Sequence, residues 1–227
     1  MKLLLTLFFI TTLYSSEVSY EIGEKIYAAT CVSCHGVDGK AQTALKFVVR
    51  PRSLSSSILS QEQSYQIIKK GSFYWGSAAD IMPAFESIYD ENQIRSISLY
   101  ISQKFNPNAE KRVATLYSES DKVSKKQMSK MLKRGKKIYK RNCSWYHGLT
   151  GIGDGEATKN PEKSIYPYNL KKTLLTSEQM FLYAKYGGEF WGTAKDDMPS
   201  WKIKYDDFTL KSVIKYIEKE FREENSN

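Results

Sequence analysis

A short cysteine–histidine motif occurs twice in this 227-residue chain, and its second copy lacks one cysteine. The first copy, Cys31–His35, has the pattern C-x-x-C-H, and the second, Cys143–His147, has the pattern C-x-x-Y-H. The chain contains three cysteines and two histidines in total, so the two copies account for all of them. Because both imidazoles follow the same spacing, we expect them to share one role, and metal ligation is the role that these residue types favour.

The complete copy predicts covalent attachment of haem. Two thiols three positions apart can each add to a vinyl group on one porphyrin edge, and the histidine that follows presents a ring nitrogen to the iron. A structural zinc site would need four nitrogen or sulfur ligands at a different spacing, and the chain has no further cysteines or histidines to supply them. A thioredoxin-like pair would lie in a βαβ pattern, which the sequence lacks. The remaining alternative is a structural disulfide beside an unrelated histidine.

The motif belongs to a longer internal repeat. Residues up to the motif recur 112 positions later, and residues after it recur 116 positions later, so the second unit has four extra residues in a glycine-rich loop. We therefore divide the chain into a first unit at 17–106, a basic linker at 107–134 and a second unit at 135–227. The repeated pairs are Gly23 and Gly135, Tyr27 and Tyr139, Pro51 and Pro167, Leu54 and Leu170, Gly71 and Gly187, Trp75-Gly76 and Trp191-Gly192, and Met82-Pro83 and Met198-Pro199.

Capping patterns predict short helices in both units. Three capping boxes indicate where helices begin, and two glycines indicate where two of them end. The long spans between these helices would be unusual in an ordinary core, and they are explained if they wrap a cofactor. We therefore predict an all-α chain of short helices and long loops. The boxes are Ser60 with Gln63, Asp90 with Gln93 and Thr176 with Gln179, and the glycines are Gly71 and Gly187.

The first sixteen residues predict export. Lys2 precedes an apolar run from Leu3 to Leu13, and small residues follow, which is the order of a secretory signal peptide. The run is shorter than the roughly 20 residues that a membrane-spanning helix needs. An uncleaved anchor is the alternative, because Leu13 and Tyr14 suit a cleavage site poorly. Since thioether haem is attached outside the cytoplasm, we expect a periplasmic protein that is not integral to the membrane.

The linker is strongly basic. Residues 107–134 contain eight Lys or Arg and three Asp or Glu, a net charge of +5. Such a run is usually a solvated helix face, and the alternative is a docking surface for an acidic partner or a membrane. Weak aromatic interleaving and the predicted export argue against a nucleic-acid partner.

With these motifs the chain resembles a tandem dihaem class I c-type cytochrome, similar to the two-domain cytochromes c of bacterial respiratory chains. The resemblance covers residues 18–222 apart from the linker, and it rests most on the complete motif and the two Met-Pro steps. It implies two cytochrome c domains, each wrapped around one haem c. It assigns Cys31, Cys34 and Cys143 as thioether anchors, and His35, Met82, His147 and Met198 as iron ligands.

The resemblance also implies that the first and last helices of each domain cross at a glycine, which lets the two backbones approach closely. Gly23 and Tyr27 would meet Tyr100 in the first unit, and Gly135 and Tyr139 would meet Tyr216 in the second.

Other residues have two interpretations. Methionines are common core residues as well as iron ligands. Trp75 and Trp191 fit either core packing or an N–H bond to a haem propionate. Arg50 and Arg52 fit either a solvated surface or propionate partners.

Tyr146 departs from the family pattern, because it replaces the second cysteine of the second motif. Three outcomes are compatible with this change: haem attached through Cys143 alone, haem bound without a covalent bond, or an empty site. We favour attachment by one thioether, because His147 and Met198 are both retained.

The combined features predict a periplasmic carrier that passes single electrons between respiratory-chain partners, such as an acidic or membrane-bound oxidase or reductase. Two alternatives are a haem-containing oxidoreductase and an electron-entry subunit of an oxidase or reductase complex. An enzyme haem needs an exchangeable iron position, and each unit offers both a histidine and a methionine as ligands, which favours the carrier.

Overall fold

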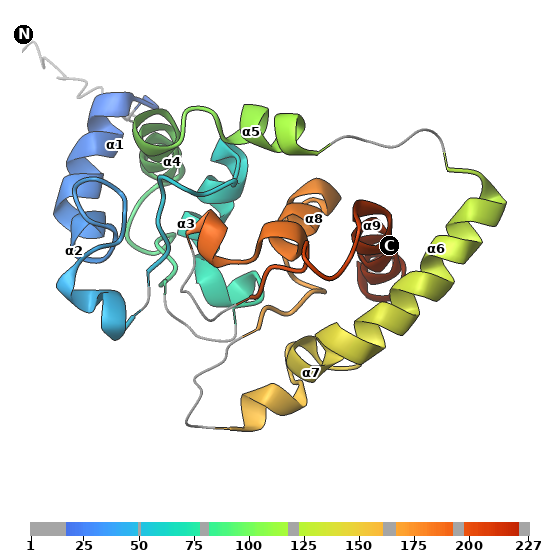
Figure 1. Ribbon diagram of the computed structural model, residues 1–227. Coiled ribbons are helices and arrows are strands. Elements are labelled where there is room, and N and C mark those ends of the chain that lie inside the picture. The colour runs from blue at the N-terminus through green and yellow to red at the C-terminus, as the bar shows by residue number, and fades with distance from the viewer. Residues whose placement is uncertain are drawn as a thin grey trace, which may run out of the picture.

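The computed structural model describes residues 17–49, 51–77, 82–117, 123–160, 167–192 and 198–222. The predicted signal peptide and Arg50 lie outside these ranges. The described residues form helices and loops and contain no strand, which confirms the all-α prediction. Figure 1 shows the first unit in blue to green beside the second unit in yellow to red. In the part of the chain that is described, no helix is both long enough and apolar enough to cross a bilayer.

The α-helices of each unit follow the same order, from a helix that runs into the motif to a last helix that packs against that first helix. In the first unit these are α1 (Tyr20–Ile26), a π-helical turn (Tyr27–Cys31), α2 (Val32–His35), a 3-10 turn (Ala44–Phe47), α3 (Gln61–Tyr74) and α4 (Glu91–Phe105). The linker contributes α5 (Ala109–Leu116) and the start of α6 (Lys125–Ile138). The second unit continues with a π-helical turn (Tyr139–Cys143), α7 (Ser144–His147), 3-10 turns at Glu156–Lys159 and Glu189–Trp191, α8 (Ser177–Tyr186), α9 (Asp207–Ile217) and a π-helical turn (Glu218–Arg222).

All three predicted capping boxes are present. At the start of α3, α4 and α8 the cap side chain accepts from the third backbone N–H, and the glutamine there returns a bond to the cap backbone. The predicted helix ends also hold. Gly187 follows α8, and at Gly71 the backbone of α3 breaks with a φ of 76° before one further turn.

The first and last helices of each unit cross as the resemblance implies. A Cβ atom on Gly23 would collide with the carbonyl of Ser96 in α4, and one on Gly135 would collide with the carbonyl of Ser212 in α9. Glycine is therefore required for these contacts. Beside each crossing the paired tyrosine rings pack with centroids 5.3 Å apart in the first unit and 5.5 Å apart in the second.

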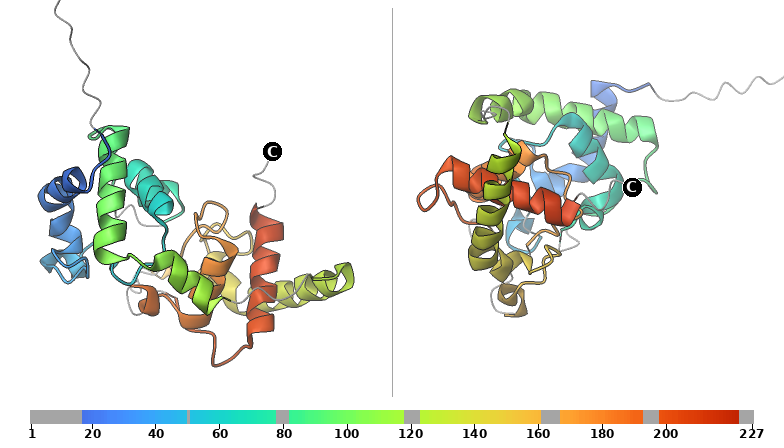
Figure 2. Two further views of the ribbon diagram at one scale, coloured as in Figure 1. Left: turned by 90° about the horizontal axis from the view of Figure 1, so that it is seen from above. Right: turned by 90° about the vertical axis from the view of Figure 1, so that its right-hand side faces the viewer.

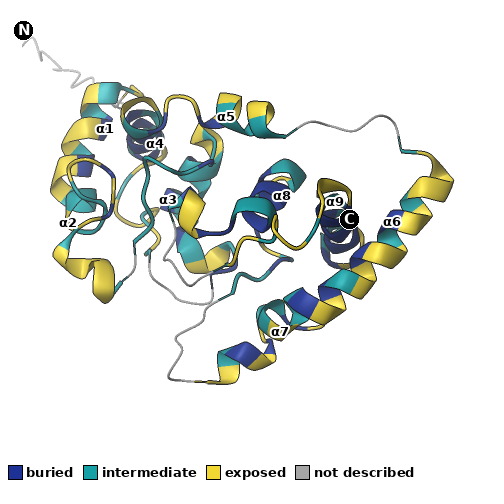
Figure 3. Ribbon diagram, viewed as in Figure 1, coloured by how far each residue is buried: buried dark blue, intermediate teal, exposed yellow. Residues whose placement is uncertain are grey.

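Two buried clusters form the core, one in each unit. The first is built from α3, α4 and Tyr27, and the second from α8, α9 and Tyr139. Figure 3 shows buried residues on α4, α8 and α9 facing inward. The second cluster also receives Ile58 from the first unit, and Val113 and Leu116 of α5 pack against it. Helix α5, which lies in the predicted linker, therefore contributes to the packing of the second unit.

Backbone hydrogen bonds join the two units in a reciprocal pattern. The N–H of Ser53 donates to the carbonyl of Gly192 at 2.9 Å, and the N–H of Asn169 donates to the carbonyl of Gly76 at 2.8 Å. Asn169 is the repeat counterpart of Ser53, and Gly192 is the counterpart of Gly76. Such an exchange is the signature of a two-fold relation between two similar bodies. Figure 2 shows the two units from two further directions.

Two glutamines meet at the centre of this contact. Gln63 Nε2 donates to Gln179 Oε1 at 2.7 Å, and Gln179 Nε2 donates to Gln63 Oε1 at 2.8 Å. Each amide also donates to a backbone carbonyl of the other unit, Gln63 to Leu174 at 2.7 Å and Gln179 to Ile58 at 2.6 Å. Both glutamines serve in capping boxes as well, so these side chains define two helix starts and the contact between the units.

Candidate haem site

A tyrosine fixes the motif loop in each unit. Tyr27 Oη donates to the carbonyl of Gly36 at 2.6 Å, and Tyr139 Oη donates to the carbonyl of Gly148 at 2.7 Å. Both glycines end their short helix with a φ of 77°, a conformation that favours glycine. The first helix of each unit thus positions the histidine that directly precedes the glycine.

The two histidines are oriented identically. Nδ1 of His35 lies 3.0 Å from the carbonyl oxygen of Arg52, and Nδ1 of His147 lies 3.0 Å from that of Tyr168. A carbonyl can only accept, so Nδ1 carries the proton and the lone pair is on Nε2. Burial lowers the pKa of both histidines, although each carbonyl bond opposes the shift. Each imidazole is therefore held neutral, with Nε2 ready to ligate a metal ion.

In the first unit, His35 and Met82 line one cavity together with Cys31. The empty space within it, including the part that is open to solvent, is about 530 Å³. Cys34 does not line the cavity and is partly exposed. Nitrogen, thioether sulfur and thiol donors around an apolar space fit a covalently bound haem. The other lining residues are Thr30, Leu54, Leu59, Ser64, Ile67, Ile68, Phe85, Tyr89, Ile97 and Ile101.

The glycine that breaks α3 and the glycine that follows α8 contact the backbone of the two methionines. A Cβ on Gly71 would lie 2.9 Å from the carbonyl oxygen of Met82, and one on Gly187 would lie 2.8 Å from that of Met198. The next residue in each case donates its N–H to the same carbonyl, at 3.0 Å from Ser72 and at 2.7 Å from Gly188. Both methionines are thus placed by the same backbone arrangement.

Cys31, Cys34 and Cys143 are all free thiols. Burial raises the pKa of Cys31 to about 12, with the charge of Cys34 adding to the rise. Burial alone raises the pKa of Cys143 to about 12. Both thiols therefore stay protonated at neutral pH, which makes them slow to oxidise or exchange before attachment.

The second unit keeps the scaffold and changes the lining. Cys143 and Met198 both pack against its buried cluster. The counterparts of Ser64 and Ile67 are the larger Met180 and Tyr183, and both are buried. Side chains therefore occupy more of the space near α8 than their counterparts do near α3.

The glycine-rich loop packs on the altered motif. The N–H of Gly155 donates to the carbonyl of Tyr146 at 3.1 Å, and a Cβ on Gly155 would collide with the carbonyls of Trp145 and Tyr146. The four extra residues of the second unit thus bring a loop against the position where the cysteine is replaced.

Both tryptophans bond to the helix that precedes them, which agrees with core packing rather than with a bond to a haem propionate. The indole N–H of Trp75 donates to the carbonyl of Gln66 at 3.0 Å, and that of Trp191 donates to the carbonyl of Leu182 at 3.1 Å. The two carbonyls are repeat counterparts. Because each N–H is already bound to the preceding helix, a propionate is not its partner here.

Arg52 has a role that sequence reasoning missed. Its guanidinium lies 4.7 Å from the ring centroid of Tyr168, and Nη1 donates to Tyr183 Oη at 3.5 Å. Tyr168 is the repeat counterpart of Arg52. The side chains of the two residues whose carbonyls orient the histidines therefore stack on each other between the units. The fixed spacing of 116 was the available signal, since it pairs these positions.

Comparisons with known proteins bear on the first unit. Residues 19–101 match the family model described as cytochrome c oxidase, cbb3-type, subunit III. Among solved structures, a chain of the Kuenenia stuttgartiensis reducing HAO-like protein complex Kustc0457/Kustc0458 is similar, with 19% identity and a TM-score of 0.46, over 91% of this chain and 100% of that one. A search of curated proteins finds no match. Residues 19–101 are therefore similar to a class I c-type cytochrome domain, a kind of domain that binds haem c covalently and transfers single electrons through it.

Proposed function

We propose that this protein is a periplasmic dihaem cytochrome c that passes single electrons between respiratory-chain partners. The observation that carries the proposal is the duplication of the histidine geometry, with each Nδ1 3.0 Å from a backbone carbonyl at the same repeat position. Position-for-position agreement of this kind supports a second haem site in the second unit.

In the first unit, Cys31 and Cys34 would anchor the haem, and His35 and Met82 would be its axial ligands. The bound haem supplies an iron that changes reversibly between the ferric and ferrous states. The chain's own residues fix the histidine tautomer, hold the methionine loop at Gly71 and line the cavity with apolar side chains. Methionine as the sixth ligand raises the reduction potential and closes the iron to substrates.

In the second unit, Cys143 would form one thioether, and His147 and Met198 would be the axial ligands. Tyr146 cannot ligate the same iron face, because His147 directly follows it. The bulkier lining around Met180 and Tyr183 predicts a haem that sits differently from the first and is held less firmly.

The location and the partners belong to the same proposal. Residues 1–16 support export to the periplasm, where the carrier would meet a membrane-bound or acidic oxidase or reductase. The enzyme alternative is disfavoured because each unit offers both a histidine and a methionine as iron ligands, whereas a catalytic haem needs an open position.

A redox titration of the purified holoprotein tests this function. We expect two one-electron steps per chain and no spectral change when carbon monoxide is added to the ferrous protein. A single step per chain would contradict the dihaem proposal. Stoichiometric carbon monoxide binding at either haem would instead favour the oxidoreductase alternative, because it requires an exchangeable ligand. A second assay supplies the reduced protein to a membrane oxidase as its electron donor. Turnover would support a free carrier over an electron-entry subunit of a complex.

A further inference from the structure

We propose that α6 and the loop beyond it form a docking surface for an acidic protein, so that this partner binds at the second unit rather than the first. The inference rests on the proposed electron-transfer function and specifies the class of partner and the unit to which it binds.

Helix α6 and the turn that follows it are basic without interruption in sequence. No Asp or Glu occurs between Lys122 and Gly153. Helix α6 and the turn after it carry nine exposed cations, which are Lys125, Lys126, Lys130, Lys133, Arg134, Lys136, Lys137, Lys140 and Arg141. Arg134 donates to Thr209 Oγ1 at 3.1 Å. None of the nine forms an ion pair with a residue in the described ranges.

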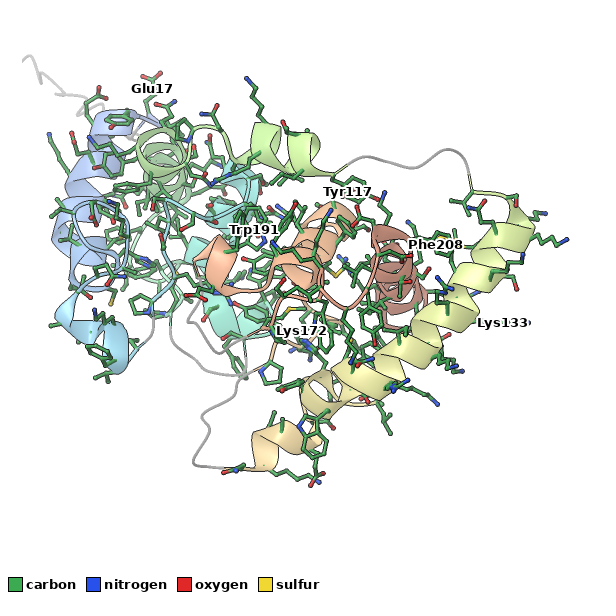
Figure 4. The ribbon with its side chains drawn as sticks, viewed as in Figure 1. Glu17, Tyr117, Lys133, Lys172, Trp191 and Phe208 are labelled. Carbon is green, nitrogen blue, oxygen red and sulfur yellow. The ribbon has the colours of Figure 1, made fainter. Side chains whose placement is uncertain are left out.

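The cations face outward because the apolar side of α6 packs against α9. Met131 and Gly135 are buried where α6 crosses α9. Figure 1 shows α6 along one edge of the molecule, and in Figure 4 the side chain of Lys133 points away from the rest of the chain. The helix therefore presents a charged ridge to an incoming partner.

The ridge ends at an apolar patch beside the second motif. Trp145 and Leu149 are 55% and 68% exposed. They line a surface hollow with Lys140 and Arg141 at the end of the basic run. Trp145 lies between Cys143 and His147 in sequence. An apolar centre with a charged rim is the usual anatomy of a protein–protein interface.

The equivalent surface of the first unit has the opposite charge. Residues 129–147 carry seven Lys or Arg and no acid, whereas their repeat counterparts 17–35 carry three Glu and one Lys, a net charge of −2. Glu21 stands where Lys133 is, and Glu24 where Lys136 is. Figure 4 shows Glu17 and Lys133 at opposite ends of the molecule. An acidic partner is therefore attracted to one unit and repelled from its counterpart.

The features of the patch favour a protein over a lipid surface. Asp154 and Glu156 line the same hollow as Trp145. They would be pressed against anionic headgroups in a membrane-bound state. A membrane-surface helix also needs an exposed apolar face, and the apolar side of α6 packs on α9 through Met131. A folded acidic protein covers a limited area, so its carboxylates can pair with α6 while Asp154 and Glu156 stay in water.

The test uses a plant-type [2Fe–2S] ferredoxin, a small acidic one-electron donor, as the probe. Its reduced cluster loses one electron and a ferric haem of the full-length holoprotein gains it, which stopped-flow absorbance follows. Replacing Lys130, Lys133, Lys136 and Lys137 with glutamine should lower the rate constant at low ionic strength on the order of tenfold, and should flatten its salt dependence. Carbodiimide cross-links to the ferredoxin should map to α6.

A matched variant replaces four exposed lysines of the first unit with glutamine, at Lys25, Lys40, Lys46 and Lys104. It should change the rate constant less than twofold. The reverse variant, Glu21→Lys with Glu24→Lys, should add cross-links on α1. Equal effects of the two glutamine sets, or cross-links spread over both units, would overturn the inference.

Two further readouts separate the possible failures. Each variant must keep the wild-type haem content and full reduction by dithionite; a wild type without two reducible haems contradicts the proposed function itself. Vesicles of phosphatidylcholine with one-third phosphatidylglycerol serve as the lipid probe. A contrary result is that the protein does not bind ferredoxin but sediments with these vesicles only when the α6 lysines are present. That result would overturn the acidic-protein inference in favour of a membrane surface.

Discussion

The guanidinium of Arg52 stacks over the ring of Tyr168 at 4.7 Å, and the carbonyls of these two residues orient the two histidines. The proposed haem sites are therefore linked through one side-chain contact. A cation in this position disfavours the additional positive charge of a ferric iron, so it raises the potential of any haem near it.

Replacing Arg52 with glutamine should lower both reduction potentials, each by the equivalent of ~1 kcal/mol or less. Arg52→Lys keeps the charge but loses the planar stack, so its two potentials should lie between those of the wild type and those of the glutamine variant. Spectroelectrochemistry of the holoprotein measures both values. A shift confined to the first haem would contradict the link between the sites.

Replacing Met82 with alanine should abolish the weak sulfur-to-iron charge-transfer band of the first haem and lower its potential, because the thioether ligand is lost. Met131→Leu is the control, since Met131 is buried in the α6 packing and leucine conserves its volume. If both variants keep the band and the potential, Met82 is a packing residue.

Removing one amide of the central glutamine pair should destabilise the contact between the units. Gln179→Ala leaves the carbonyl of Ile58 and the amide of Gln63 without their partner, at a cost of ~1–3 kcal/mol. Guanidinium unfolding, followed by haem absorbance and by helical circular dichroism, measures the change in free energy.

Gln66→Ala serves as the comparison, since the Gln66 side chain donates to the exposed Glu62 of the same helix. A Gln179→Ala loss no larger than that of Gln66→Ala would show that the pair adds nothing to stability.

Local sequence patterns predicted the helix starts of both units. Capping boxes such as Ser60 with Gln63 act within four residues, so the helix starts were predictable. The crossing glycines Gly23 and Gly135 could be placed because the resemblance supplied the partner helix. The motif Cys31–His35 predicted a haem attachment site, and the structure adds the apolar cavity that His35 lines.

The contacts between the units could not be predicted, because they join residues that are far apart in the sequence. Gln63 was recognised as a capping residue, but its bond to Gln179 joins positions 116 residues apart and depends on how the units pack. The packing of α5 on the second unit was missed for the same reason, since Val113 and Leu116 lie in a segment dominated by charge. The larger side chain at Tyr183 is visible in the sequence, but its burial depends on how α8 packs.

The central claim is that two haems are bound and that the second is attached through Cys143 alone. The reduced alkaline pyridine spectrum tests it most directly, together with the mass of the mature chain. One unreacted vinyl group stays conjugated with the porphyrin, so the account predicts two covalent haems and an absorption component shifted to longer wavelength. Tyr146→Cys should remove that component while the haem count stays at two. A mass with one covalent haem, and no second haem on extraction, would contradict the account and leave a monohaem carrier with a structural second unit.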